Sequence, residues 1–237
     1  MTVTVHGTLG WPLRRAVSLF GDREALVEGR LRLSYRDWAR RIDGLSGGLR
    51  RLGLAAGDVV ATIGQNTYRH LECWLGIPAA AMVINDLNFR LAAPELEFIV
   101  KDCGAKAIVT DAKFLPVALA LKAACPSVAY LIYADDGPAP DEAVHFDELT
   151  AATPLPANHP ELLAITGDTL ASISYTGGTT GRPKGVMQSH GNLLANARHL
   201  QIANPYSALD RYIHAAPMFH AADAMNAYIV TWRGPAT

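Results

Sequence analysis

The sequence predicts an α/β fold in which parallel-rich sheets are flanked by helices. Short apolar runs alternate with longer amphipathic runs along most of the chain, and strands separated by helices of this length favour parallel pairing. Glycine, proline or aspartate stands between most of these runs, as expected at the ends of helices and strands. Half of the 237 residues are apolar, so the chain can bury a substantial core.

The predicted elements follow one another through short connections. Ser34, with Asp37 three residues later, is a variant of the capping box at a helix start, and Gly53 supplies the stop. Asp111 stands where it would cap a later helix. Residues 1–13 lack a basic region and a sustained apolar run, so we interpret them as a lead-in. The pattern predicts, in order, a hairpin at 25–27 and 31–33, a helix to 52, a strand at 59–63, a helix at 70–80, a strand at 82–85, a helix at 94–103, a strand at 106–110, a helix at 111–123 and a strand at 128–132.

Residues 134–160 are rich in Asp, Pro and Ala and have weak periodicity, so we expect a surface connection with one short element at 144–149. This predicts a first α/β subdomain at 1–133, a connecting segment at 134–160 and the start of a second α/β subdomain at 161–237. The second subdomain is expected to contain a strand at 171–175, a Gly/Thr-rich loop, a strand at 185–188 and a helix at 192–201.

Composition excludes several classes of protein. The net charge of -1 and the pI near 6.7 argue against nucleic acid as a partner. No run of eighteen uncharged apolar residues is present, so no transmembrane segment is predicted. Cys73, Cys103 and Cys125 are far apart and odd in number, which suits neither a disulfide framework nor a metal cluster. We expect a reducing, cytoplasmic environment in which they are small core residues.

The segment from Ser174 to Gly185 is suited to bind a polyphosphate. Its glycines allow backbone N–H groups to approach phosphate oxygens, its threonines add hydroxyl groups, and Lys184 adds a positive charge. Pro183 before Lys184 and Gly185 after it exclude a Walker A loop. The alternative is a solvated turn between two strands. The predicted phosphate-binding residues are Thr176, Gly177, Gly178, Thr179, Thr180, Gly181 and Lys184, with Thr176 also a candidate Mg²⁺ ligand.

The run Tyr-Thr-Gly-Gly-Thr-Thr-Gly-Arg-Pro-Lys-Gly-Val at 175–186 resembles the signature of the adenylate-forming (AMP-binding) superfamily. That superfamily includes acyl-CoA synthetases, luciferases and the adenylation domains of peptide synthetases. Gly177 stands where a serine or threonine is usual, so one hydroxyl is missing. The resemblance implies that the loop holds the β- and γ-phosphates of ATP.

Three other segments support the resemblance. Ala216–His220 is similar to the family's Pro-hydrophobic-Phe-His segment, which implies that His220 lies beside the acyl substrate and the thioester channel as a candidate catalytic residue. The alternative for His220 is a helix N-terminal residue without chemistry. Asp86–Leu91 resembles a structural turn of the same enzymes, in which Arg90 fixes the loop through hydrogen bonds. In Ser189–Leu193 we expect His190 and Asn192 to cap a helix start.

The resemblance implies ATP-dependent activation of a carboxylic acid to acyl-AMP and transfer of the acyl group to CoA. ATP, Mg²⁺ and CoA would take part, and the acid would be a fatty or an aryl acid. The resemblance runs from about Asp22 to the end of the sequence. The family's later acidic Mg²⁺ residue, its ribose-binding aspartate and its C-terminal lysine have no counterpart here. We therefore expect an incomplete large N-terminal domain without the C-terminal lid domain, inactive alone; ATP–pyrophosphate exchange above a Lys184→Ala control would contradict this.

Two alternatives remain open from the sequence. The chain could be a nucleotide- or partner-binding remnant without catalysis, in which an exposed sheet edge needs a partner and could let it form a homo-oligomer. It could also be an unrelated nucleotide-binding protein with a coincidental loop. The spacing between the loop and Pro217–His220 argues against the latter.

Overall fold

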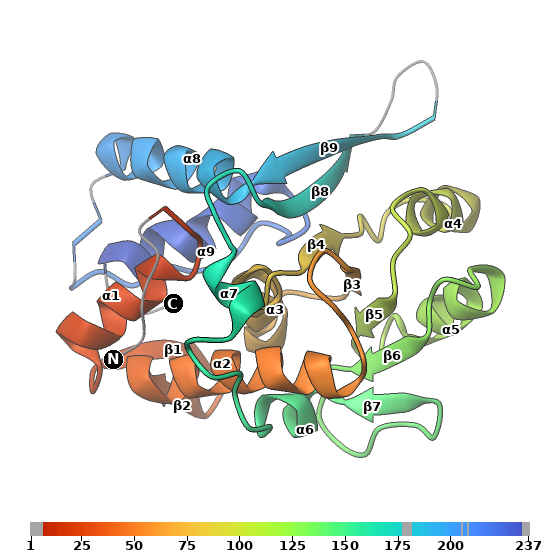
Figure 1. Ribbon diagram of the computed structural model, residues 1–237, viewed down its shortest axis with the longest axis horizontal. Helices are drawn as coiled ribbons and strands as arrows, with labels where there is room; N and C mark the ends of the chain where they lie inside the picture. Colours follow the sequence, from red (N-terminus) through yellow and green to blue (C-terminus); the bar gives the residue numbers. More distant parts are fainter. Residues whose placement is uncertain (1–6, 177–181, 205, 208, 234–237) are drawn as a thin grey trace.

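A seven-stranded sheet crosses the molecule in the order β7-β6-β5-β3-β4-β8-β9 (Figure 1). This computed structural model describes residues 7–176, 182–204, 206–207 and 209–233. All neighbouring strands are parallel except β8 and β9, which form an antiparallel hairpin. The strands are β3 Val59–Ile63, β4 Val83–Asp86, β5 Ala107–Thr110, β6 Tyr130–Tyr133, β7 Ala143–His145, β8 Leu170–Thr176 and β9 Lys184–Ser189.

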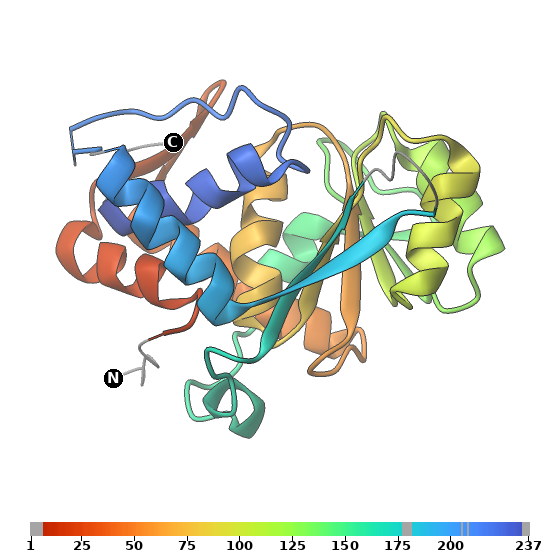
Figure 2. The same ribbon diagram turned by 90° about the horizontal axis from the view of Figure 1, so that it is seen from above.

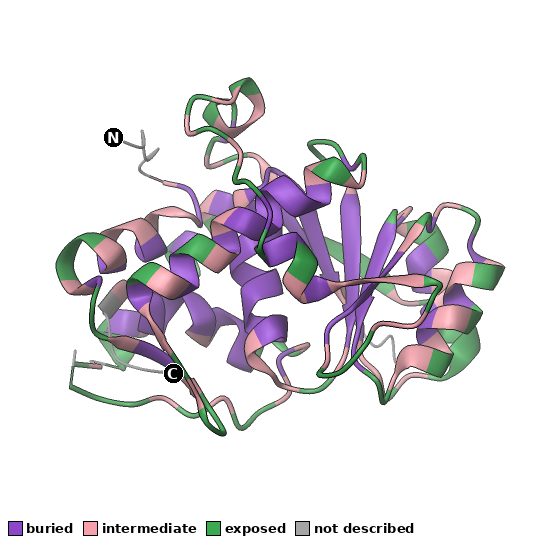
Figure 3. Ribbon diagram, turned by 90° about the horizontal axis from the view of Figure 1, so that it is seen from below, coloured by how far each residue is buried: buried purple, intermediate pink, exposed green. Residues whose placement is uncertain are grey.

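Helices cover both faces of the sheet, which confirms the predicted α/β class (Figure 2). The helices α4 and α5 pack on one face, and α1, α2, α3, α8 and α9 gather on the other. β3 is buried along its whole length, as parallel strands between two helical layers are, and Figure 3 shows the central strands as buried. The helices are α1 Trp11–Phe20, α2 Tyr35–Arg51, α3 Tyr68–Ala79, α4 Ala93–Asp102, α5 Leu115–Ala124, α6 Phe146–Thr150, α7 Pro160–Leu163, α8 His190–Ala203 and α9 Ala221–Arg233.

The predicted hairpin and the helix after it are confirmed. β1 Glu24–Glu28 pairs antiparallel with β2 Leu31–Ser34 in a small separate sheet. Ser34 caps α2, because its hydroxyl accepts a hydrogen bond from the Asp37 N–H at 3.1 Å. This cap satisfies one of the backbone donors that every helix start leaves open.

The structure corrects two expectations about helices. The lead-in at 1–13 overlaps α1, which the sequence reasoning missed; α1 begins at Trp11 with Pro12 in its first turn, and Leu13 and Ala16 are buried. Asp111 does not cap α5, whose N-cap is Phe114. The Asp111 carboxylate instead accepts hydrogen bonds from the Gln65 N–H at 2.7 Å and the Phe114 N–H at 3.0 Å. It therefore stabilises two loops at the ends of neighbouring strands.

The predicted short element at 144–149 corresponds to β7 and α6. Strands from both sides of residues 134–160 lie in one sheet, because β4 pairs with β8. The proposed subdomain boundaries at 1–133, 134–160 and 161–237 remain a prediction.

Two further findings concern the cysteines and the predicted absence of a transmembrane segment. Cys73 and Cys125 are buried, Cys103 is half-buried, and none of the three is in a disulfide. Burial raises the pKa of all three thiols, to about 11 for Cys103. In the part of the chain that the structure describes, no helix is long and apolar enough to cross a lipid bilayer.

Candidate functional site

The β8–β9 hairpin presents the ends of the predicted phosphate loop. Thr176 lies opposite Lys184 in the strand register, and both residues are exposed. Gly177, Gly178, Thr179, Thr180 and Gly181, which the sequence assigns to phosphate binding, lie outside the described residues. The two described members of the set are therefore brought together across the mouth of the loop.

The loop end of the hairpin is anchored on α4. The Tyr175 hydroxyl donates a hydrogen bond to an Asp102 carboxylate oxygen at 2.5 Å, and the Arg182 guanidinium lies 5.5 Å from the centroid of the Phe98 ring. Burial, and then the bond to Asp102, raise the pKa of Tyr175, so the hydroxyl stays a donor. Gly185 lies opposite Tyr175, and an added Cβ there would come within 3.1 Å of the Tyr175 ring. The same Cβ would lie 3.0 Å from an Ile173 methyl, so the Tyr175 and Ile173 side chains would have to shift by a few tenths of an ångström.

The Pro217–His220 segment packs against the loop that follows β4. The Phe219 ring meets the Phe89 ring edge-on at 4.8 Å, and the Arg90 guanidinium lies 5.8 Å from the Phe219 centroid. Phe89 in turn stacks on Phe114. The sequence predicted that Arg90 fixes its loop through hydrogen bonds. The bond that does so is donated by the Arg90 main-chain N–H to the Asn88 side chain, whereas the Arg90 guanidinium contacts Phe219.

His220 is exposed and lies just before α9. Its carbonyl accepts hydrogen bonds from the N–H groups of Asp223 and Ala224, both at 3.0 Å. Its main chain thus begins the helix, while the imidazole stays accessible. Because β3, β4 and β8 are parallel, the loops that follow them leave the sheet at one edge. Ligands in open α/β sheets commonly bind at this carboxyl edge.

Sequence reasoning missed a buried polar cluster beside this segment. Asp223 is completely buried and accepts hydrogen bonds from Tyr212 at 3.1 Å and from His214 Nδ1 at 2.8 Å. Burial and the neighbouring carboxylate raise the pKa of Tyr212, which keeps its hydroxyl protonated. An acidic residue in an apolar helical run was the only sequence signal for this cluster.

A second buried network lies at the end of β4. Asp86 accepts hydrogen bonds from Thr62 at 2.7 Å and from the Trp74 indole at 2.8 Å, and it lies 2.7 Å from His70 Nε2. Burial alone would lower the pKa of His70, but the charge and hydrogen bond of Asp86, the Gln65 carbonyl and the charge of Asp111 together outweigh it and raise that pKa. The network fixes the strand end from which the Phe89 loop leaves.

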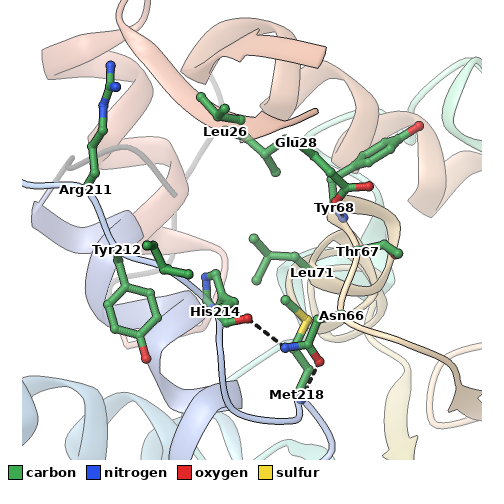
Figure 4. A pocket seen from close by; sticks show the side chains of 12 residues that line it. Leu26, Glu28, Asn66, Thr67, Tyr68, Leu71, Arg211, Tyr212, His214 and Met218 are labelled. Carbon is green, nitrogen blue, oxygen red and sulfur yellow. Dashed lines mark hydrogen bonds between the residues drawn. The ribbon is translucent and has the colours of Figure 1, made fainter. Parts of the chain in front are cut away.

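A pocket of about 380 Å³ opens between β1, the start of α3 and residues 211–218 (Figure 4). Asn66 reaches from the loop after β3 to this last segment, where it makes three hydrogen bonds to the main chain. The sequence reasoning did not identify Asn66. The lining is mostly apolar and consists of Leu26, Val27, Glu28, Asn66, Thr67, Tyr68, Leu71, Arg211, Tyr212, Ile213, His214 and Met218.

Comparison with known proteins places these features in a family. The family model of AMP-binding enzymes matches residues 13–236, nearly the whole chain. The chain belongs to the AMP-binding enzyme family. A long-chain-fatty-acid–CoA ligase from Thermus thermophilus is 34% identical over 214 residues, which are 88% of this chain and 38% of that protein. A feruloyl-CoA synthase from an Amycolatopsis species is also 34% identical, over 92% of this chain and 40% of that protein.

Solved structures of the AMP-binding family agree with the fold. The N-terminal domain of FACL13 from Mycobacterium tuberculosis, solved with a bound inhibitor, superposes with a TM-score of 0.84 at 29% identity and covers 97% of this chain and 56% of that one. A fatty acyl CoA synthetase from the same organism gives 0.84 at 28% identity and covers 97% and 44%. The chain thus spans about two fifths of the length of its curated relatives.

Two of the predicted phosphate-binding residues lie within the described part of the chain. Lys184 and the Thr176 hydroxyl are both exposed at the loop mouth, where a polyphosphate can reach them. Among the residues the structure describes, no cluster of three or more His, Cys, Asp or Glu side chains could hold a metal ion. Mg²⁺ bound with ATP normally takes most of its ligands from phosphates and water. Thr176 as a Mg²⁺ ligand stays a prediction.

Proposed function

We propose that this chain takes part in ATP-dependent activation of a fatty or aryl carboxylic acid and its transfer to CoA. A carboxylate oxygen attacks the α-phosphorus of ATP, and pyrophosphate leaves to give acyl-AMP. The CoA sulfur then attacks the acyl carbonyl, AMP leaves, and the thiol proton is released. The observation that carries the proposal is the β8–β9 hairpin, in which Thr176 and Lys184 oppose each other at the mouth of the loop.

The loop's proposed role is to hold the departing pyrophosphate. The Lys184 ammonium would neutralise charge on the β- and γ-phosphates, and the backbone N–H groups of residues 177–181 would donate to their oxygens. Thr176 would contribute a hydroxyl to Mg²⁺, which screens phosphate charge when it is bound. The anchors on α4 would keep the two arms of the loop in place before ATP arrives.

The proposed acyl side is the Pro217–His220 segment. His220 would border the acyl or pantetheine path, since its side chain is exposed at the carboxyl edge while its main chain is fixed by α9. Relatives named for long-chain fatty acids and for ferulate support a fatty or an aryl acid as the substrate class. The reduced cysteines are consistent with a cytoplasmic enzyme.

Lys184→Ala tests this function directly. A charge-assisted hydrogen bond contributes about 1.5–3 kcal/mol, so we expect the dissociation constant of Mg·ATP to rise about tenfold to a hundredfold by calorimetry. Lys106→Ala removes the same charge from an exposed position far from the loop and should leave affinity unchanged. Equal affinities of Lys184→Ala and wild type would contradict the proposed role of the loop.

A second function, nucleotide or partner binding without catalysis, has one observation in its favour. β9 is at the edge of the sheet and exposes Val186 and Met187. ATP binding without acid-dependent pyrophosphate exchange, together with oligomers in solution, would favour this second function.

A further inference from the structure

The side chain of Asn66 binds a stretch of main chain about 150 residues later in the sequence. Its Nδ2 donates hydrogen bonds to the carbonyls of His214 at 2.8 Å and Ala216 at 2.7 Å, while its Oδ1 accepts from the Met218 N–H at 3.0 Å (Figure 4). Two carbonyls and one N–H as partners fix which end of the amide carries the nitrogen. Asn66 therefore binds main-chain groups of residues 214, 216 and 218 with one amide.

The loop that carries Asn66 is itself held on both sides. The Gln65 N–H donates to Asp111 at 2.7 Å, and the Gln65 carbonyl lies 3.1 Å from His70 Nδ1. On the other side the Thr67 hydroxyl caps α3 by accepting from the His70 N–H at 3.2 Å. Because its neighbours Gln65 and Thr67 are held in place, Asn66 loses little backbone entropy when its amide binds the segment.

The held segment leads directly into Phe219 and His220. In the described part of the chain, Asn66 is the hydrogen-bond partner of the Met218 N–H and of the carbonyls at 214 and 216. Met218 is buried, so its N–H would lose a partner without gaining water. Phe219 gives the second attachment, through Phe89. Asn66 and Phe89 thus hold the segment at two points just before His220. These two contacts limit where the His220 main chain can lie at the carboxyl edge of the sheet.

We propose that Asn66 is a positioning residue for the acyl-facing segment Pro217–His220. It sets the placement of this segment and so the affinity for the carboxylic acid, whereas nucleotide affinity depends on the β8–β9 hairpin. The part of this inference that concerns the acid rests on the proposed function. The hold on the main chain does not, and the two can be measured separately.

The first measurement is amide hydrogen exchange at Met218 in protein labelled with ¹⁵N-methionine. The chain has only five methionines, and Met218→Leu identifies the signal. Loss of an amide hydrogen bond shifts a local opening equilibrium about tenfold, so Asn66→Ala should speed exchange at Met218 by about that factor. Exchange at Met82 and Met225, in other parts of the core, should stay as in wild type. Unchanged exchange at Met218 overturns the proposal.

The second measurement separates positioning from general destabilisation. With a non-hydrolysable ATP analogue present, we expect Asn66→Ala to weaken binding of decanoate or ferulate about tenfold, and affinity for the analogue itself to change less than about twofold. Asn192→Ala is the matched control, because it removes a side-chain amide whose oxygen accepts a hydrogen bond from the Ser189 N–H at the start of α8. Equal loss of acid and analogue affinity, or the same pattern in Asn192→Ala, overturns the positioning role.

A second variant covers the case in which Asn66→Ala does not fold. Asn66→Asp has the same shape, but a carboxylate cannot donate to the carbonyls of His214 and Ala216. It should therefore speed exchange at Met218 and weaken acid binding in the same way. Wild-type protein that binds neither the analogue nor the acids would contradict the proposed function, while exchange at Met218 would still decide whether Asn66 holds the segment.

Discussion

Single buried side chains link distant parts of this chain. His190, the first residue of α8, is almost completely buried, and its Nδ1 accepts a hydrogen bond from the Leu9 N–H at 3.1 Å. The ring thereby attaches the segment before α1 to the start of α8. Burial lowers the pKa of His190 to about 4, so the ring is neutral in the folded protein at neutral pH. The sequence predicted a helix cap here, and the cap is made by Ser189 with Asn192.

The lowered pKa of His190 predicts a pH dependence of stability. The unfolded ring has a pKa of about 6.5, so between that value and about 4 the unfolded chain binds more protons. The stabilisation is present above pH 6.5 and is lost as the pH falls. From pH 7 to pH 5, the free energy of unfolding of wild type should fall by about 2 kcal/mol more than that of His190→Asn. Urea unfolding of both proteins at pH 7 and at pH 5 measures this difference.

The contribution of His190 is given by the difference between wild type and His190→Asn in how their free energy of unfolding changes with pH. The raised pKa of His70 acts in the opposite sense, since it adds stability as the pH falls, but it is present in both. Parallel pH profiles for wild type and His190→Asn would show that His190 is not the group responsible.

At the scale of the element, α2 illustrates how packing overrides helix propensity. Gly44 and Gly47 lie on the face of α2 that meets α6 and the chain after it, and an added Cβ would overlap the carbonyl oxygens of Thr150 and Thr153. Glycine costs a helix about 1 kcal/mol relative to alanine. Here it lets two backbones approach more closely than any side chain would permit.

Gly44→Ala should therefore destabilise the protein although alanine favours helices. Overlap with a main-chain carbonyl cannot be relieved by rotating a side chain, so we expect a net loss of about 1–3 kcal/mol in the free energy of unfolding. Gly76→Ala in α3 is the control: the atoms nearest to its Cβ belong to side chains, the closest being a Leu45 methyl at 2.7 Å, and side-chain atoms can move. Greater loss in Gly76→Ala than in Gly44→Ala, by urea unfolding, would contradict this account.

At the scale of the whole molecule, the sheet ends in an exposed strand. β9 pairs with β8 and is the last strand in the order of the sheet. Met187 is 68% exposed on it, beside the exposed Val186. An apolar edge strand offers unpaired backbone groups and an apolar surface to another chain, so it favours self-association. The opposite edge is formed by β7, which has three residues.

Met187→Lys should reduce concentration-dependent association of the chain. A charge on an edge strand must be desolvated when strands pair, and natural proteins protect edges in this way. Light scattering after size-exclusion chromatography, over a series of concentrations, measures the effect. Leu209→Lys is the control, because Leu209 is 86% exposed but lies outside any strand. An equal effect of both substitutions would indicate general surface hydrophobicity and not edge pairing.

Local patterns determined most of the elements. Apolar runs bounded by glycine and aspartate predicted the strands, and Ser34 predicted the start of α2, because these signals act within a few residues. The misses have a physical reason. Asp111 looked like a helix cap, but it accepts a hydrogen bond from Gln65, which the sheet brings close only after β3 and β5 have paired. α1 has an apolar stripe at helical spacing, formed by Leu13, Ala16, Val17 and Phe20, but the interpretation of residues 1–13 as a lead-in overlooked it.

The sequence by itself determined the α/β class and the family, because the phosphate-loop motif is contiguous and its residues need no partner from elsewhere to be recognised. Only the tertiary structure decided how the site is held together. Asn66 and Met218 are far apart in the chain, and the register of β8 with β9 sets Lys184 opposite Thr176. Contacts of this kind depend on which strands are neighbours in the sheet. The residues next to a side chain in the sequence do not determine which strands are neighbours.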